Sequence, residues 1–420
     1  MNQKSFVISF AMSLACVMSN LASGQGLGFA SPESVGLSAS KLDEATASLQ
    51  QHIDAGDIAG VVAAVARDGK IVYFESLGMM NIEQLKPMQE DALFRIYSMT
   101  REITSLAVLQ LYEQGKFQMD DPIKMYLPDF EAQRVLLDPE STDITQTRPR
   151  NGDITVAHLL THTSGLGSRS SRLYREQKVR DKNITLDQMT ENAARVPLFH
   201  DPGSAFLYGI HATILGKLVE VWSGQPFEVY MEQQVFQPLE MDSTMFWAEG
   251  ADAERLAELY RPTDGRLLPY QIETVPWTMR PRLMEGGVGL LSSVKDFLNF
   301  SQMVLNRGEF NGRRILQEET AALMYENAVP EAAMPIGSSG YWLGSGWTLG
   351  GFNLVMDPAA YSWPVSKGTI WWDGSAGTRY FIDPVQDMII VIMAQISPSS
   401  GGGFREDFTT LVDAAIVDRR

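Results

Sequence analysis

Cysteine is nearly absent from this sequence, because Cys16 is the only one among 420 residues. We expect the segment that contains it to be removed, which would leave a mature chain without cysteine. Disulfide bonds, catalysis by a thiolate and zinc sites with cysteine ligands are then excluded. An exported protein without disulfides must depend on its hydrophobic core, and a chain of this length can bury a large one.

Basic residues are also scarce. The chain has 34 Lys and Arg against 51 Asp and Glu, a formal net charge of −17, and no basic cluster. Nucleic acids and anionic membrane surfaces are bound through groups of Lys and Arg. We therefore expect no nucleic-acid partner and a small molecule or short peptide as the substrate. The sequence leaves the oligomeric state open.

Long apolar runs are confined to the N-terminus, which reads MNQKSFVISFAMSLACVMSNLASGQG. Lys4 precedes an apolar run over residues 6–18, and small residues follow at positions 22–24. This order predicts a secretory signal peptide over residues 1–24 and an exported protein, periplasmic or secreted. The alternatives are an uncleaved anchor, for which the run is short, and a lipoprotein site at Cys16. After cleavage we expect no integral membrane segment.

Two β-hairpins lie near the ends of the chain. In GVVAAVARDGKIVYFESLGMMN, two β-rich runs flank Asp68-Gly69, which is a strong hairpin signal. Near the C-terminus, TIWWDGSAGTRYFIDP and MIIVIMAQIS are joined through residues 383–387. Residues 40–54 and the final segment, 404–420, have helical periodicity.

A long and mostly helical stretch, roughly residues 115–300, separates the two β regions. Its helix signals include TVAHLLTH, HATILGKLVEVWSG and SVKDFLNFSQMVLNRGE. Strands at both ends with helices between them predict an α/β fold: one antiparallel sheet built from both termini, flanked by helices, with an inserted and mostly helical lobe. A cleft between two lobes is a favoured place for a ligand site.

Ser98 stands where a long apolar helix begins, in FRIYSMTREITSLAVLQLYEQGK, residues 94–116. The helix is apolar nearly all round, which predicts burial, and Gly115 is a plausible stop. Ser98 would then lie at the positive end of the helix dipole, where developing negative charge is stabilised. Arg101 lies three residues further, on the same helix face. Taken alone, Ser98 is better explained as a helix N-cap.

Three further segments change that interpretation: Tyr208 before a helix in FLYGIHATILGK, AHLLTHTSGL earlier in the chain, and WWDGSAGTRYFIDP later on a strand. With them the chain resembles the serine β-lactamase and penicillin-binding-protein superfamily, and within it class C β-lactamases, D-amino-acid peptidases and family VIII esterases. LLTHTSGL, GGVGLLSS and QVFQPLEM are also similar to stretches of that family. The resemblance runs from about residue 33 to the C-terminus, and the combination of motifs makes it specific.

The resemblance implies a β-lactamase-like fold over residues 25–420. Residues 33–115 and 285–420 would form an α/β lobe, and residues 116–284 a helical lobe. No metal ion or organic cofactor is implied.

The resemblance also implies roles for single residues. Ser98 would be the acyl-accepting nucleophile, and the Tyr208 phenol would exchange protons with it. Trp372, Asp373 and Gly374 fall at the family's third motif, on the strand that borders the cleft, and would contact the substrate. The backbone N–H groups of Ser98 and Ser375 would form the oxyanion hole.

Arg101 departs from the family pattern, which has lysine at this position. That lysine can give and take a proton, whereas an arginine cannot, because its pKa exceeds 12. One interpretation is that Arg101 lowers the pKa of Tyr208, so that the tyrosinate acts as the base. A second is a silenced site in a binding protein, and a third is a substitution in an otherwise normal enzyme.

Trp372 is the second departure, because many penicillin-recognising members carry Lys-Thr-Gly at this motif. Tryptophan offers no charge to a substrate carboxylate, and the adjacent Asp373 adds a negative charge near the cleft. Both changes favour uncharged esters or amides. Alternatively, Trp372 simply packs on the sheet and Asp373 forms local hydrogen bonds.

We therefore expect a serine hydrolase that acts on ester or amide bonds through an acyl-Ser98 intermediate. A silenced binding protein and an acyltransferase are the alternatives. The absence of a G-x-S-x-G elbow weakens an α/β-hydrolase assignment. His158 and His162 have the spacing of a zinc helix, but the glutamate of HExxH is missing, so we expect no metal there. His200 and His211 flank Tyr208 and are expected to be packed or surface residues.

Overall fold

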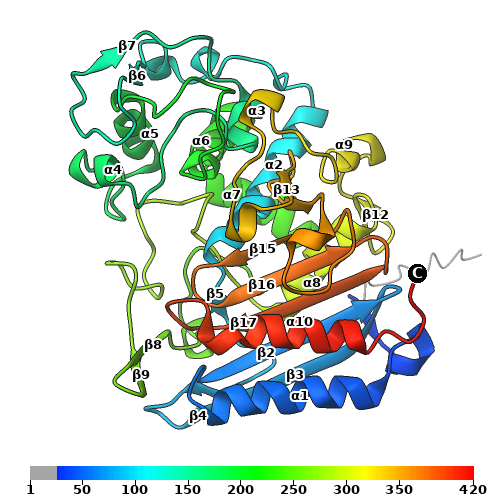
Figure 1. Cartoon of the computed structure of the whole chain (residues 1–420). Helices are drawn as coiled ribbons and strands as arrows, with labels where there is room; N and C mark the ends of the chain where they lie inside the picture. Colours follow the sequence, from blue (N-terminus) through cyan, green and yellow to red (C-terminus); the bar gives the residue numbers. More distant parts are fainter. Residues whose placement is uncertain (1–25) are drawn as a thin grey trace, which may run out of the picture.

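The chain is built around a nine-stranded sheet whose strands come from both ends of the sequence (Figure 1). This computed structural model describes residues 26–420, so the predicted signal peptide, residues 1–24, lies outside the described residues. In spatial order the sheet contains β1 (Gly28–Phe29), β3 (Lys70–Asn81), β2 (Gly60–Arg67), β17 (Met388–Ala394), β16 (Thr378–Asp383), β15 (Ile370–Gly374), β14 (Asn353–Val355) and β13 (Ser345–Trp347), and β4 (Lys86–Pro87) also pairs with β3.

The N-terminal and C-terminal hairpins meet at the pair β2 and β17, which runs antiparallel from Val61 opposite Ala394 to Arg67 opposite Met388. This confirms the predicted sheet. One pair differs from the prediction, since β1 runs parallel to β3. A helix separates these two strands in the sequence, so no tight turn forces them to be antiparallel.

Side chains of the central strands alternate between two hydrophobic cores, because successive residues of a strand point to opposite faces. Val61 and Val65 of β2 belong to the core shared with α1 (Ala39–Asp54) and α10 (Phe404–Ala414). Val62 and Ala64 belong to the core shared with α2 (Thr100–Glu113) and α8 (Val294–Leu305). The sheet is therefore covered by helices on both faces, with α1 and α10 in front in Figure 1.

Helix α2 is buried over nearly its whole length, as its apolar sequence predicts. It ends at Glu113, and Gly115 follows with a φ of 68°, a left-handed conformation that suits the end of a helix.

The region between the β segments forms the lobe at the top of Figure 1. Its helices are α3 (Val156–Leu160), α4 (Arg172–Glu176), α5 (Leu186–Arg195), α6 (His211–Ser223) and α7 (Phe227–Met231). The region is less helical than predicted, because it also holds two hairpins. One, β6 (Val135–Leu136) with β7 (Thr147–Arg148), lies in this lobe, and the other, β8 (Tyr260–Thr263) with β9 (Arg266–Pro269), projects at the lower left of Figure 1. Asp264-Gly265 turns the second hairpin, so the same Asp-Gly signal that marked β2 and β3 was present here.

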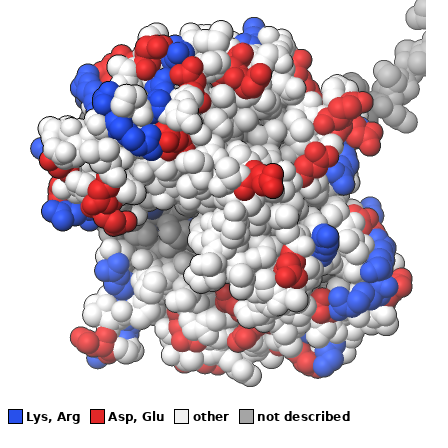
Figure 2. Space-filling model, turned by 45° about the horizontal axis from the view of Figure 1, so that its top comes forward, with Lys and Arg blue, Asp and Glu red and all other residues white. Residues whose placement is uncertain are grey.

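Short elements complete the described chain: β5 (Phe94–Arg95) paired with β10 (Leu291–Ser292), β11 (Glu309–Phe310) paired with β12 (Arg313–Arg314), and α9 (Glu318–Ala322). Within residues 26–420 no helix combines the length and apolar character needed to cross a bilayer. Acidic and basic side chains are intermixed on the face shown in Figure 2, and a recess opens between the helical lobe and the projecting part below it.

Candidate active site

Ser98 lies in a single 3₁₀ turn, Tyr97–Met99, that leads directly into α2. Tyr97 has a φ of 42°, a left-handed conformation that is strained for a bulky residue. Such strain persists only where the surroundings hold it, and Tyr97 and Met99 are both fully buried. Ser98 itself is half-buried and faces a pocket of about 250 Å³. The pocket is lined by Ser98, Arg101, Ser168, Arg169, Ser170, Tyr208, Gly209, Ile210, Thr213, Glu285, Gly287 and Val288.

The end of β15 lies against the segment that leads to Ser98. A Cβ atom on Gly374 would be 2.4 Å from the carbonyl oxygen of Ile96, so glycine is needed for this approach. Ser375 follows and is exposed, and its backbone N–H has no acceptor among residues 26–420. The oxyanion hole of Ser98 and Ser375 stays a prediction, but the two segments that would build it are adjacent.

Three side chains converge on the hydroxyl group of Tyr208. Arg101 donates a hydrogen bond to it from Nε, and Trp372 donates from its indole nitrogen at 2.7 Å. The Ser98 side chain lies close enough to the same hydroxyl group to lower its pKa. Arg101 and Trp372 are 107 and 164 positions away from Tyr208 in the sequence, so the fold alone brings these groups together.

Burial raises the pKa of Tyr208 above its ordinary value, and the charge of Arg101, the nearby Ser98 side chain and the hydrogen bond from Trp372 offset this only in part. Arg101 lowers the pKa of Tyr208, as in the first sequence interpretation, but burial outweighs this effect. The resting phenol is protonated at neutral pH. Its two N–H donors cannot accept a proton, so they would stabilise the phenolate once it forms.

Arg101 is a buried cation without a carboxylate partner. It is 6% exposed, and among residues 26–420 no carboxylate oxygen lies within 4.0 Å of it. Its Nη1 donates to the Gly209 carbonyl oxygen at 2.9 Å, and its guanidinium carbon lies 4.3 Å from the centre of the Tyr208 ring. A Cβ atom on Gly287 would be 3.0 Å from Nη1, so the glycine-rich segment leaves room for the guanidinium. The positive charge therefore acts mainly on Tyr208.

Two histidines near Arg101 stay neutral. Burial lowers the pKa of His162 and of His211 well below the ordinary value, and the charge of Arg101 adds to the effect. Their Nδ1 atoms are 2.8 Å apart, so one imidazole donates a hydrogen bond to the other. The His162 ring lies 4.6 Å from the Tyr208 ring. The pair thus packs against the tyrosine without adding charge.

Glu102 is a buried acid that sequence reasoning missed. It is fully buried, one of its oxygens accepts a hydrogen bond from Tyr380 at 2.9 Å, and the other has no partner among the described residues. Burial raises the pKa of Glu102 to about 8, so the carboxyl group is neutral at pH 7. A carboxylate beside Arg101 would have cancelled its charge, whereas the protonated acid does not. A charged residue inside an otherwise apolar helix was the available signal.

Trp372 and Asp373 point to opposite faces of the sheet, as neighbours on a strand must. Trp372 is 3% exposed, packs on Tyr208 and donates a hydrogen bond to it, so it holds the tyrosine in place; its substrate-binding role stays a prediction. Asp373 pairs with Arg379 at 3.2 Å and Arg405 at 3.3 Å. The expected negative charge near the cleft is therefore neutralised by two buried arginines, and the alternative of local bonding is the correct one.

Two contrasting sets of residues reach the Ser98 pocket, one through Tyr208 and the other through Arg169 and Glu285. We call the first the aromatic wall; it surrounds the Tyr208 ring with other rings at centroid distances of 5.1 to 5.8 Å, and it consists of Tyr208, Trp342, Trp347 and Trp372. We call the second the ionic wall; it consists of Arg169, Arg180, Lys182, Glu273 and Glu285.

Glu285 is the centre of the ionic wall. It is 1% exposed and accepts from Arg180 at 2.6 Å and from Lys182 at 2.7 Å. Burial alone would raise the pKa of Glu285, but Lys182 and Arg180 hold it well below the ordinary value. Glu273 accepts from Arg180 and from Arg169, whose guanidinium lies over the Tyr97 ring. This wall joins the loop around α4 to the loop before β10.

The histidines of HLLTH have separate partners. His158 Nδ1 accepts from the backbone N–H of Thr155 in a capping box, while His162 contacts His211. Within residues 26–420 no three His, Cys, Asp or Glu side chains are grouped as metal ligands. His200 is bonded to a neighbouring backbone carbonyl.

Comparisons with known proteins identify the family of this chain and proteins similar to it. The family model described as Beta-lactamase matches residues 45–414. Protein Rv1367c of Mycobacterium tuberculosis (strain ATCC 25618 / H37Rv) is 30% identical over 365 residues, covering 85% of this chain and 90% of the relative. Esterase EstB of Burkholderia gladioli is 30% identical over 368 residues, covering 80% and 86%. The solved structure of EstCE1, a hydrolase with promiscuous acyltransferase activity, has a TM-score of 0.77 and 27% identity, covering 89% of this chain and 98% of that one.

Proposed function

This chain belongs to the Beta-lactamase family, and from that premise we propose that it is a serine hydrolase that cleaves esters through an acyl-Ser98 intermediate. The observation that carries the proposal is the convergence of Ser98, Arg101 and Trp372 on the Tyr208 hydroxyl. A serine enzyme needs a group that takes the hydroxyl proton, and Tyr208 is the side chain in reach. Relatives named as an esterase and as a hydrolase support the same reaction class.

The first half of the reaction starts from the deprotonated form of Tyr208: Ser98 Oγ attacks the carbonyl carbon while its proton passes to the Tyr208 phenolate oxygen. The backbone N–H groups of Ser98 and Ser375 would hold the oxyanion. The carbon–oxygen bond to the leaving group then breaks, and the leaving alkoxide receives the proton from Tyr208. In the second half, water attacks the acyl group, gives its proton to the same oxygen, and Ser98 leaves with that proton.

Arg101 contributes fixed positive charge in this scheme and no proton transfer. Because the pKa of Tyr208 is raised at rest, the active tyrosinate is a minor form at neutral pH. Activity should therefore rise with pH into the alkaline range, since catalysis needs the deprotonated phenol.

The raised pKa of Tyr208 also favours one competing function, a silenced binding protein. Acyl transfer to an alcohol or amine is a second alternative, because the structurally similar EstCE1 is a hydrolase with promiscuous acyltransferase activity. Product analysis with a competing alcohol distinguishes transfer from hydrolysis.

The test is turnover of p-nitrophenyl butyrate by the wild type, Ser98→Ala and Arg101→Lys. We expect turnover in the wild type, and loss in Ser98→Ala of both turnover and acyl-enzyme, read by intact-protein mass. Activity that appears only in Arg101→Lys would mean a silenced hydrolase. If all three proteins are inert, the substrate class or the site assignment is wrong.

A further inference from the structure

A second pocket, of about 260 Å³, lies next to the Ser98 pocket and shares no lining residue with it. Tyr97, the residue before the nucleophile, forms part of it. The ion pair of Arg169 with Glu273 lies between the two pockets, because Arg169 lines one and Glu273 the other. One water needs about 10–15 Å³ of such volume, so the pocket has room for a small molecule.

Arg95 enters this pocket with half of its guanidinium unsatisfied. Its Nη1 is fixed by the carbonyl oxygen of Ala257 at 2.6 Å and by Gln395 Oε1 at 3.1 Å. Its Nε and Nη2, which form the edge that binds a carboxylate side-on, have no acceptor among residues 26–420. Neither does Arg95 form an ion pair within the described chain. The arginine is thus held by one nitrogen and presents the other two.

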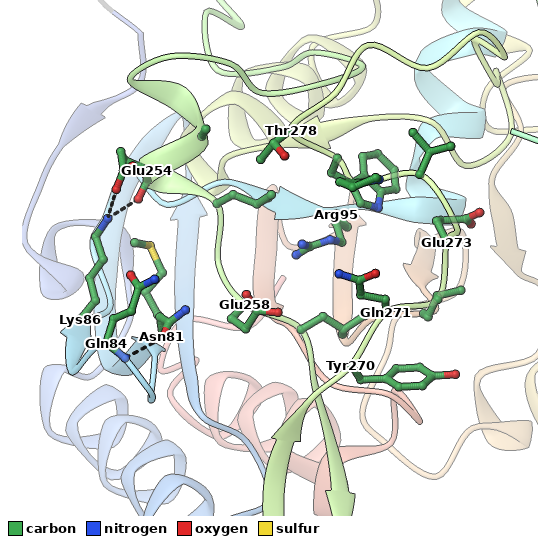
Figure 3. Close-up of a pocket in the computed structure, with 18 of the residues that line it drawn as sticks. Asn81, Gln84, Lys86, Arg95, Glu254, Glu258, Tyr270, Gln271, Glu273 and Thr278 are labelled. Atoms are coloured by element: carbon green, nitrogen blue, oxygen red, sulfur yellow. Dashed lines mark hydrogen bonds and ion pairs between the residues drawn. The ribbon is translucent and has the colours of Figure 1, made fainter. Parts of the chain in front are cut away.

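Glu258 also enters the pocket without a cation partner in the described chain (Figure 3). It is half-buried, and the gap to Arg95 exceeds the 4.0 Å of an ion pair. The other charges of the pocket are already paired: Lys86 with Glu254 at 3.7 Å, and Glu273 with Arg169 and Arg180. One cation and one anion are left facing the same polar space.

We infer that this pocket binds a small zwitterion of the amino-acid or dipeptide class, with its carboxylate on Arg95 and its ammonium group on Glu258. The carboxylate would accept two parallel hydrogen bonds from Nε and Nη2. The Tyr97 hydroxyl is buried without a hydrogen-bond partner among the described residues, which is a further polar group in this wall of the pocket. The inference does not depend on the proposed hydrolysis, because no residue of the second pocket takes part in it.

The test is isothermal titration of the full chain with glycylglycine, glycylglycinamide and N-acetylglycylglycine. The last two probes each lack one charge of the dipeptide. We expect saturable 1:1 binding of glycylglycine and affinities lower by about tenfold or more for the other two, the loss of one charge-assisted contact. Equal affinities for all three probes, or no binding of glycylglycine in the millimolar range, would overturn the inference.

Glu258→Gln identifies the ammonium partner. This variant should bind glycylglycine about tenfold more weakly than the wild type does. Its affinity for N-acetylglycylglycine should be unchanged, because that probe has no ammonium group. Glu254→Gln is the matched control in the same pocket and should change neither probe. Ser98→Ala should keep the wild-type affinity; if it abolishes binding, the dipeptide occupies the Ser98 pocket and the inference is wrong.

Discussion

The aromatic wall and the ionic wall border the same pocket but handle charge in opposite ways. Beside the aromatic wall, one buried cation, Arg101, has no carboxylate partner and lies near a neutral tyrosine, two neutral histidines and a protonated acid. In the ionic wall, Glu285 and Glu273 are each paired with two cations. A charge whose partners are fixed contributes to the fold, whereas a charge without a partner remains available to a reacting group.

Removal of the Glu285 charge should give the largest change in stability. In Glu285→Gln, Arg180 and Lys182 keep their charges in a buried place and lose their common partner. Breaking a buried ion pair from one side costs about 3–5 kcal/mol, so urea denaturation should show a free energy of unfolding lower by that amount. Lys41 and Glu44 form an exposed pair, so Glu44→Gln is the control and should change stability by less than about 1 kcal/mol. If Glu285→Gln lowers the free energy of unfolding by less than about 1 kcal/mol, the ionic wall does not stabilise the fold.

Arg101→Met is the corresponding experiment on the unpaired charge beside the aromatic wall. It removes a buried cation that has no carboxylate partner, so the free energy of unfolding should stay within about 1 kcal/mol or rise. If the charge stabilises the phenolate of Tyr208, kcat/KM on p-nitrophenyl butyrate should fall by about 10²-fold, in the range of other preorganised donors.

Two outcomes would contradict this role of Arg101. A stability loss as large as that of Glu285→Gln would make the arginine structural. An unchanged rate with unchanged stability would leave it without a role in catalysis. Arg307, whose guanidinium lies 4.0 Å from the ring of Tyr325, offers a control at a distant arginine–tyrosine contact.

These two walls also show what could be read from the sequence and what could not. The strands, the Asp68-Gly69 turn, helix α2 and the position of Ser98 follow from local patterns, because each depends on neighbouring residues. The convergence on Tyr208 was available only through the family resemblance, since spacing alone does not place residues 107 and 164 positions apart in contact. The ionic wall had no local signal at all.

Asp373 is a different case, because a local rule could have placed it correctly. Residues alternate along a strand, so a Trp372 that faces the tyrosine requires Asp373 to face away from it. Treating Trp372, Asp373 and Gly374 as one unit ignores the alternation of side chains between the two faces of the strand. What no sequence rule supplied was the partner on the other face, Arg405 of α10.

Glu102 tests why the Arg101 charge is not compensated, and its effect depends on pH. Its pKa is about 8 in the folded protein and about 4.5 in the unfolded chain, so the folded state binds the extra proton between these values. Stability should therefore fall as pH rises from 4.5 to 8, and Glu102→Gln, which has nothing to ionise, should not show this fall. We expect the variant and the wild type to be equally stable near pH 4.5, within about 1 kcal/mol, and the variant to be more stable at pH 8 by about 4 kcal/mol.

The measurement is urea denaturation of both proteins at several pH values, with Glu113→Gln on the exposed end of the same helix as control. Parallel pH curves for the wild type and Glu102→Gln would mean that Glu102 is ionised in the folded protein at neutral pH. Arg101 would then have an anionic neighbour, and the contrast between the two walls would disappear. If the free energy of unfolding falls with pH only in the wild type, Glu102 is neutral in the folded protein. The helix then carries a carboxyl group beside the arginine without a negative charge, so the positive charge of Arg101 acts on Tyr208.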